Sequence, residues 1–208
     1  MNNETKITKT TRGMNKSVRY ITVTAMLAAV SFILQYIEIS IPIMPTFIKF
    51  DFSDLPALLG SFALGPVCGV LICLVKNVLH LAFSNSMFVG ELSNFILGAV
   101  FVAVAGIIYK KKKTKTGALV GGLIGAVAMG LFSIVSNLYL VYPVYYQVMP
   151  KEAILGAYQA IIPSMKSIFQ CLICFNLPFT IVKGLISVAI SMLIYKPLSS
   201  ILKGRSEA

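Results

Sequence analysis

Polar side chains occur at helical spacing inside stretches that are otherwise strongly apolar. Asn176, Thr180 and Lys183 follow one another at i, i+4 and i+7, so a helix places them on one face. Asn137 lies in a separate apolar stretch. Amide, hydroxyl and ammonium groups are costly to bury without partners, so these four residues predict a site for a polar ligand. The alternative is that they only form hydrogen bonds between neighbouring helices.

A second set of polar residues lies where two other apolar stretches approach each other in the sequence. It consists of Lys76, Asn77, His80, Glu91 and Asn94. These residues fit either a ligand site or a Lys–Glu pair that only holds two helices together. Lys183 differs from them because its ammonium needs a partner and no acidic residue lies near it in the sequence.

The sequence does not favour a metal or redox site. The chain has one histidine and four cysteines, and all four cysteines lie in apolar runs. Cys171 and Cys174 have the CxxC spacing of half a zinc or redox site, but zinc would need a second ligand pair. We therefore interpret the cysteines as small hydrophobic side chains. The sequence also lacks a GxxxxGK[ST] loop, so we expect ATP hydrolysis to depend on another protein.

The composition excludes an ordinary soluble domain. Hydrophobic residues make up 57% of the chain and charged residues 12%, with a mean hydropathy of +0.86. Soluble domains carry about 25% charged residues. A soluble core cannot hide so much apolar surface, which predicts an all-α integral membrane protein. The net charge of +11 is typical of cytoplasmic loops in such proteins, and we do not expect nucleic-acid binding.

Basic residues predict how the chain crosses the bilayer. They cluster before the first apolar stretch, at 110–115 and near the end of the chain, and the positive-inside rule places all three clusters in the cytoplasm. Even numbers of crossings must then separate the clusters. This requirement gives six transmembrane helices with both termini inside. The predicted regions are a basic tail at 1–17, the helical domain at 18–197 and a second tail at 198–208.

The even count requires a break within residues 54–83. One helix there would give three crossings between the first two basic clusters, so the region must contain two helices. Gly65-Pro66 is a suitable place for the tight turn between them. Small residues at Gly117, Gly121 and Gly125 repeat every four positions and predict close approach of a neighbouring helix.

Two segments on the predicted outer side have unusual compositions. The loop at 40–52 contains prolines and several large apolar side chains, among them Phe47. A flexible linker would be polar, so we interpret this loop as a lid over a bound molecule; the alternative is a segment lying in the membrane interface. Residues 137–146 contain four tyrosines, including Tyr142. Such rings suit a flat aromatic ligand as well as an interfacial aromatic belt.

Five segments distributed along the chain carry a family resemblance. They are KFDFSDLPALLGSFALGP (49–66), VKNVLH (75–80), GELSNF (90–95), NLYLVYP (137–143) and LPFTIVKG (177–184). In this order they resemble the riboflavin-specific S components of energy-coupling factor (ECF) vitamin transporters, over about residues 18–197. The resemblance implies a six-helix fold with a riboflavin pocket in its outer half and a lid formed by the first outer loop.

The resemblance also implies the protein's role and partners. Riboflavin would be a transported ligand rather than a cofactor, and the chain would not be an enzyme. It would work in the bacterial plasma membrane with a transmembrane coupling protein and two ABC-type ATPases. An AxxxA surface on the first helix meets the coupling protein in this family, and Ala25 and Ala29 match it.

The resemblance assigns site residues with one departure. Family members contact the flavin through an Asn in the fifth helix and an Asn and a Lys in the sixth, and Asn137 and Lys183 match the first and last. Thr180 stands where the second amide is expected. Either its hydroxyl replaces part of that amide or Asn176, one turn outward, supplies it. The expected ligand-binding residues are Asn137, Thr180, Lys183, Asn176, Phe47, Glu91 and Tyr142.

Other functions stay open at this point. The chain could be an S component for another small vitamin, or could bind FMN and flavin analogues as well. A membrane enzyme or a structural scaffold is less favoured, because no nucleophile–base pair or carboxylate–metal group is recognisable in the sequence.

Overall fold

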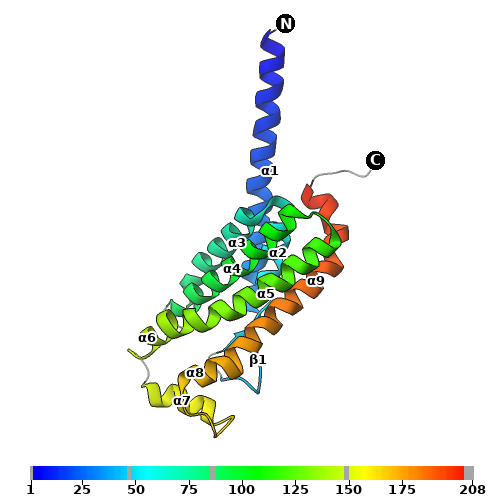
Figure 1. The fold of residues 1–208 in the computed structure, drawn as a ribbon. Coiled ribbons are helices and arrows are strands. Elements are labelled where there is room, and N and C mark those ends of the chain that lie inside the picture. Colours follow the sequence, from blue (N-terminus) through cyan, green and yellow to red (C-terminus); the bar gives the residue numbers. More distant parts are fainter. Residues whose placement is uncertain (1, 46–47, 85–87, 148–149, 204–208) are drawn as a thin grey trace.

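The computed structural model describes residues 2–45, 48–84, 88–147 and 150–203, with side chains described within 17–194. These residues form a bundle of helices and one short hairpin (Figure 1). The helices are α1 (Asn2–Tyr36), α2 (Asp54–Leu64), α3 (Pro66–His80), η1 (Leu81–Phe83), α4 (Val89–Lys111), α5 (Lys115–Ser136), η2 (Asn137–Val141), α6 (Tyr142–Tyr145), α7 (Lys151–Gln159), α8 (Ile168–Cys171), η3 (Leu172–Asn176) and α9 (Leu177–Lys203). The hairpin pairs β1 (Ile39–Ser40) with β2 (Lys49–Phe50), antiparallel.

Five helical segments are long and apolar enough to cross a membrane. They are Ser17–Tyr36, Pro66–Phe83, Val89–Lys111, Lys115–Tyr145 and Ile168–Ile194. The short apolar helix α2 adds a sixth helical segment of 11 residues. The membrane-protein prediction is thus supported by the helices themselves. The expected tail at 1–17 is continuous with the first span, because α1 runs unbroken from Asn2 to Tyr36.

The predicted break at Gly65-Pro66 is confirmed. Gly65 ends α2 and precedes Pro66, the first residue of α3. Its backbone has φ 107° and ψ 167°, a conformation that is essentially restricted to glycine. Proline at the first helical position is favourable because its missing N–H would have no helical partner there. The two residues therefore reverse the chain with almost no loop.

The predicted glycine contact is also present, between α4 and α5. A Cβ added to Gly121 would lie 2.7 Å from the carbonyl oxygen of Ala105, and one added to Gly125 would lie 2.8 Å from that of Phe101. Any side chain there would collide with backbone, so glycine allows the two helices to touch. Around this contact lies the larger apolar core, contributed mainly by α2, α3, α4 and α5.

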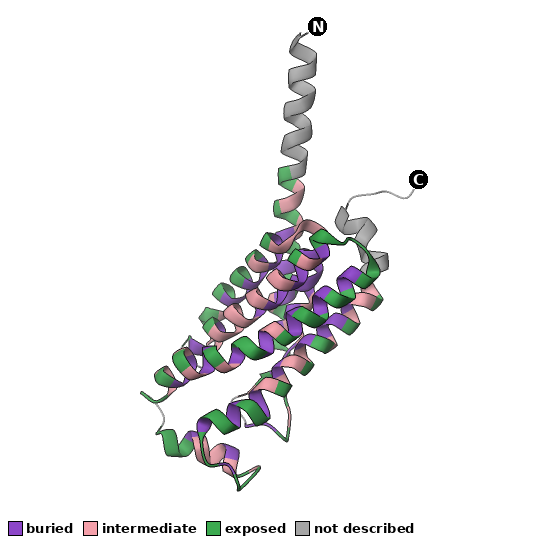
Figure 2. Cartoon of the chain, viewed as in Figure 1, coloured by how far each residue is buried: buried purple, intermediate pink, exposed green. Residues whose placement is uncertain are grey.

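Burial divides each long helix into two faces (Figure 2). The buried faces turn toward one another, whereas the outer faces carry exposed large apolar residues such as Leu123, Val127 and Leu131 on α5. Exposed apolar side chains in such numbers are unfavourable in water and favourable against lipid tails. A second, smaller apolar cluster lies away from the main core and joins α7, α8 and η3 to Met44 of the hairpin loop.

Candidate ligand-binding site

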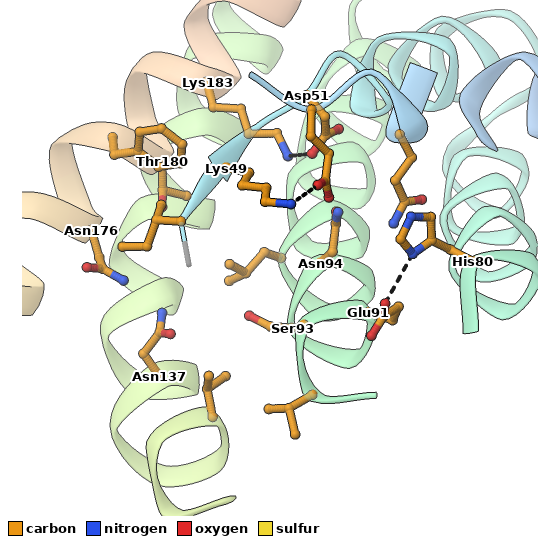
Figure 3. A pocket seen from close by; sticks show the side chains of 18 of the residues that line it. Lys49, Asp51, His80, Glu91, Ser93, Asn94, Asn137, Asn176, Thr180 and Lys183 are labelled. Carbon is orange, nitrogen blue, oxygen red and sulfur yellow. Dashed lines mark hydrogen bonds and ion pairs between the residues drawn. The ribbon is translucent and has the colours of Figure 1, made fainter. Parts of the chain in front are cut away.

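A large pocket is lined by residues from many parts of the sequence. The pocket has a volume of about 600 Å³, which is within the range for small-molecule sites. Its lining comes from α1, the hairpin segment, the first residue of α2, the end of α3 with η1, α4, α5 with η2 and α6, and η3 with α9. In Figure 3, Asn137, Asn176 and Thr180 lie on one side and His80 and Glu91 on the other.

The Asn137 carboxamide is held by its own helix. Its Nδ2 donates to the carbonyl oxygen of Ser133 at 2.7 Å, and the side chain is 8% exposed. This bond uses one of the two N–H groups and fixes the orientation of the carboxamide, so that its oxygen is available to a ligand as an acceptor. Asn137 begins η2, a π-helical turn at the end of α5. Such turns are rare and occur frequently at functional sites.

The Asn176 carboxamide is held in the opposite sense. Its Oδ1 accepts a hydrogen bond from the Tyr158 hydroxyl at 2.8 Å. This bond fixes the orientation of the carboxamide, so that its NH₂ group is available to a ligand as a donor. Asn176 ends η3, which is also a π-helical turn. Thr180 follows one turn later, is buried to a similar degree and lines the same pocket.

Lys183 has the acidic partners that no nearby sequence provides. Its Nζ lies 2.9 Å from Asp51 Oδ2 and 3.3 Å from Asp54 Oδ2. Asp54 Oδ1 in turn accepts from Lys76 Nζ at 2.8 Å. We call Asp51, Asp54, Lys76 and Lys183 the buried charge group. With two carboxylates and two ammonium groups it has no net charge.

The charge group fixes the end of the hairpin segment. Burial would raise the pKa of the Asp51 carboxyl, but the ammonium groups of Lys183 and Lys76 outweigh this effect and hold that pKa below its ordinary value. Asp51 also accepts from the backbone N–H of Ser53 at 2.8 Å. An ion pair between Glu38 and Lys49 also links the two sides of the hairpin.

The opposite wall corrects one interpretation from the sequence. Glu91 does not pair with Lys76; its Oε1 lies 3.1 Å from His80 Nδ1, and its Oε2 accepts from the Ser84 hydroxyl at 2.8 Å. Lys76 is fully buried, and its ion-pair partner is Asp54 at the start of α2 rather than Glu91 on α4. Asn77, on the next position, accepts from Gln35 Nε2 of α1 at 3.1 Å.

Six of the seven expected ligand-binding residues line this pocket. They are Asn137, Thr180, Lys183, Asn176, Glu91 and Tyr142. Phe47 lies outside the described residues. Among the described residues, no group of three or more His, Cys, Asp or Glu side chains could hold a metal ion. Ala25 and Ala29 lie away from the pocket, on an exposed face of α1.

Sequence reasoning missed three residues that organise the site. Asp51 and Asp54 are acids next to an apolar helix, which was a signal, but their partner lies about 130 positions later and the pairing needs the tertiary fold. Tyr158 had no sequence signal, because it lies in a short amphipathic helix outside the spans. It belongs to the site through its hydrogen bonds to Asn176 and Tyr142.

Comparison with known proteins places the chain in one family. Residues 19–195 match the family described as ECF transporter, substrate-specific component. The riboflavin transporter RibU of Staphylococcus aureus (strain TCH60) is 33% identical over 190 residues, covering 91% of this chain and 95% of that protein. The riboflavin transporter FmnP of Bacillus subtilis (strain 168) is 29% identical over 181 residues, covering 86% of this chain and 90% of that protein.

A solved structure agrees with the sequence matches. It is described as the S component of a bacterial ECF transporter and superposes with a TM-score of 0.72 at 31% identity, covering 90% of this chain and 99% of that chain. The family match extends over most of the chain, and the same residues form the helices and the pocket. The protein is therefore a member of the substrate-specific components of ECF transporters, a family of transport proteins rather than enzymes.

Proposed function

We propose that the protein is the riboflavin-binding subunit of an ECF-type importer. The observation that carries this proposal is the pair of oppositely held carboxamides in the pocket. The bond to Ser133 fixes the Asn137 carboxamide so that its oxygen is available as an acceptor, and the bond from Tyr158 fixes the Asn176 carboxamide so that its NH₂ group is available as a donor. A cyclic imide edge, with alternating C=O and N–H groups, is the complement of such a pair, and the pyrimidine-dione of riboflavin has this edge. The relatives named above are riboflavin transporters.

The remaining lining suits the rest of a flavin. Phe179 and Tyr142 provide aromatic surface for the ring system. Lys183 uses N–H groups on Asp51 and Asp54, and an ammonium has three, so one N–H is left for a ligand acceptor. Thr180 adds a hydroxyl on the same helical face. We thus assign Lys183 both a structural and a ligand-binding role.

The hairpin segment between α1 and α2 acts as a lid in this proposal. Its Ile48, Lys49 and Asp51 line the pocket, so a ligand in the pocket would contact it. Ile41 and Ile48 pack with Met44 against the cluster around α7 and α8. The lid therefore has apolar contacts at one end and the ion pair to Lys183 at the other.

The distribution of basic residues supports the proposed orientation, and membership of the family supports the proposed partners. We propose six crossings, with α2 as the short one, and both termini on the cytoplasmic side of a bacterial plasma membrane. The start of α1 and the C-terminal end of α9 lie at one end of the bundle, and the hairpin and α7 lie at the other (Figure 1). This arrangement agrees with the proposed topology. The exposed small residues Ala25 and Ala29 would contact the transmembrane coupling protein, which in turn works with two ABC-type ATPases.

Titration with riboflavin tests the proposal directly. Purified protein in detergent should quench flavin fluorescence saturably with one ligand per chain. Parallel titration with a vitamin of another class, such as thiamine, tests the alternative substrate. Absence of saturable quenching at micromolar riboflavin, or preference for the other vitamin, would contradict the assignment.

A further inference from the structure

A buried pair of tyrosines stands behind Asn176. The Tyr142 and Tyr158 hydroxyl oxygens are 2.6 Å apart, and the Tyr158 hydroxyl lies 2.8 Å from Asn176 Oδ1. The two tyrosines are 2% and 0% exposed, respectively. Tyr142 is among the described residues that line the pocket, whereas Tyr158 is not. The three side chains come from α6, α7 and η3, which are separate in the sequence.

These hydrogen bonds have a direction. A phenol has a single O–H to donate. The Tyr158 hydrogen is used on Asn176 Oδ1, so the bond between the tyrosines must be donated by Tyr142. The chain of donation thus runs from Tyr142 to Tyr158 to Asn176. It ends on the carboxamide oxygen.

We propose that Tyr158 is a positioning residue for ligand recognition, and that it makes Asn176, rather than Thr180, the donor for a carbonyl oxygen of the ligand. The inference rests on the proposed function, since the carbonyl is one of the two on the flavin dione. A threonine hydroxyl rotates freely and can donate or accept, so Thr180 alone does not select an acceptor. An Asn176 carboxamide whose oxygen accepts from Tyr158 presents its NH₂ group as the donor.

The architecture of α7 agrees with this role. The helix has nine residues, and two of them, Ile154 and Tyr158, are buried one turn apart. Ile154 anchors the helix in the smaller apolar cluster, and Tyr158 carries its hydroxyl to Asn176. Since η3 is a π-helical turn, Asn176 lies at a position that a regular helix would not give it. Together these features bring one hydroxyl to one carboxamide oxygen.

Ligand analogues separate positioning from simple stability. The test compares riboflavin with 2-thioriboflavin and 4-thioriboflavin, in which a weak sulfur acceptor replaces one carbonyl oxygen. Wild-type protein should bind one of the two analogues about two- to tenfold more weakly than riboflavin, the factor for one neutral hydrogen bond. In Tyr158→Phe this oxygen-to-sulfur preference should fall toward one. Tyr139→Phe, on the exposed side of η2, is the matched control and should retain the full preference.

A second variant keeps the test decisive if Tyr158→Phe folds poorly. Asn176→Asp has nearly the same shape and still accepts from Tyr158, but it has no NH₂ group. We expect it to bind riboflavin at least about tenfold more weakly. Its melting temperature in detergent is measured beside the affinity, because a carboxylate at this buried position also lowers stability.

Several results would overturn the inference. A Tyr158→Phe variant that loses affinity equally for all three flavins shows a structural role only. Undiminished riboflavin binding by Asn176→Asp shows that Asn176 does not donate to the ligand. Wild-type protein that binds none of the flavins would refute the proposed function itself, and this inference with it.

Discussion

Replacing Lys183 by methionine should reduce stability and ligand affinity for two separable reasons. Methionine keeps much of the length of the side chain without its charge. The buried charge group then has two carboxylates and one ammonium, and Asp51 loses the partner at 2.9 Å. Removing one member of a buried ion pair costs about 3–5 kcal/mol. We expect a decrease of that size in the free energy of unfolding.

A compensating variant isolates the ligand contribution. In Lys183→Met/Asp51→Asn the charge group again has no net charge, because Asp54 still faces Lys76 at 2.8 Å. Most of the lost stability should return. Affinity for riboflavin should stay low, by about 1.5–3 kcal/mol, because both variants lack the charged donor to the ligand. This corresponds to roughly 10- to 150-fold in the dissociation constant.

Thermal unfolding in detergent and fluorescence titration measure the two quantities separately. If the double variant recovers affinity together with stability, Lys183 acts only by balancing charge and does not contact the ligand. If the single and double variants are equally unstable, the aspartates do not depend on Lys183, and the electrostatic argument fails.

The pH dependence of the single variant gives an independent check. In the native protein the lysines keep the pKa of Asp51 below its ordinary value, so its carboxylate stabilises the fold above about pH 4, and this stabilisation is lost as pH falls through the lowered pKa. Without Lys183, burial opposes the charge with one ammonium fewer, and the pKa of Asp51 rises. The stability defect of Lys183→Met should therefore shrink as pH falls from 7 toward about 5. A defect that grows on acidification would contradict this reasoning.

Three further changes test other parts of the molecule. Ala25→Trp or Ala29→Trp should abolish co-purification with the coupling protein while riboflavin binding to the isolated subunit persists; loss of both would make this face an internal packing surface. Gly65→Ala should lower the free energy of unfolding by about 1–3 kcal/mol through its backbone conformation alone, because an added Cβ meets nothing within 4 Å. Asn137→Leu should weaken riboflavin binding about tenfold, and unchanged affinity in a folded variant would remove Asn137 from the site.

Local sequence features were sufficient for much of the fold. The break at Gly65-Pro66 was predictable because an even number of crossings and a glycine–proline pair point to the same position. The contact at Gly121 and Gly125 was predictable because a repeat of four puts small residues on one helical face. The break can be predicted from the number of membrane crossings and one dipeptide, and the contact from the spacing of residues within one helix. Neither prediction needs the identity of a residue distant in the sequence.

Partners distant in the sequence were the part that could not be predicted. Lys183 was recognised as an ammonium in need of a partner, but the choice of Asp51 and Asp54 depends on where the hairpin meets α9. The two π-helical turns were also invisible, since nothing in their composition distinguishes them from α-helix. They change which way Asn137 and Asn176 point, so the orientation of the carboxamides required the structure.

The positions of the two proposed contact regions on α1 suggest how the ligand and the partner could influence each other. Gln35 and Tyr36 line the pocket, and Ala25 lies ten residues earlier on an exposed face of the same unbroken helix. At 1.5 Å per residue the separation is about 15 Å. An α-helix moves as a rigid element, so a shift imposed on its pocket end by the ligand is transmitted to the small-residue face without local unfolding. A ligand shifts such an equilibrium only if it binds one position of α1 more tightly than another. We therefore infer that any signal of pocket occupancy depends on contacts to α1 and the lid, rather than on the η2 and η3 amides that select the ligand.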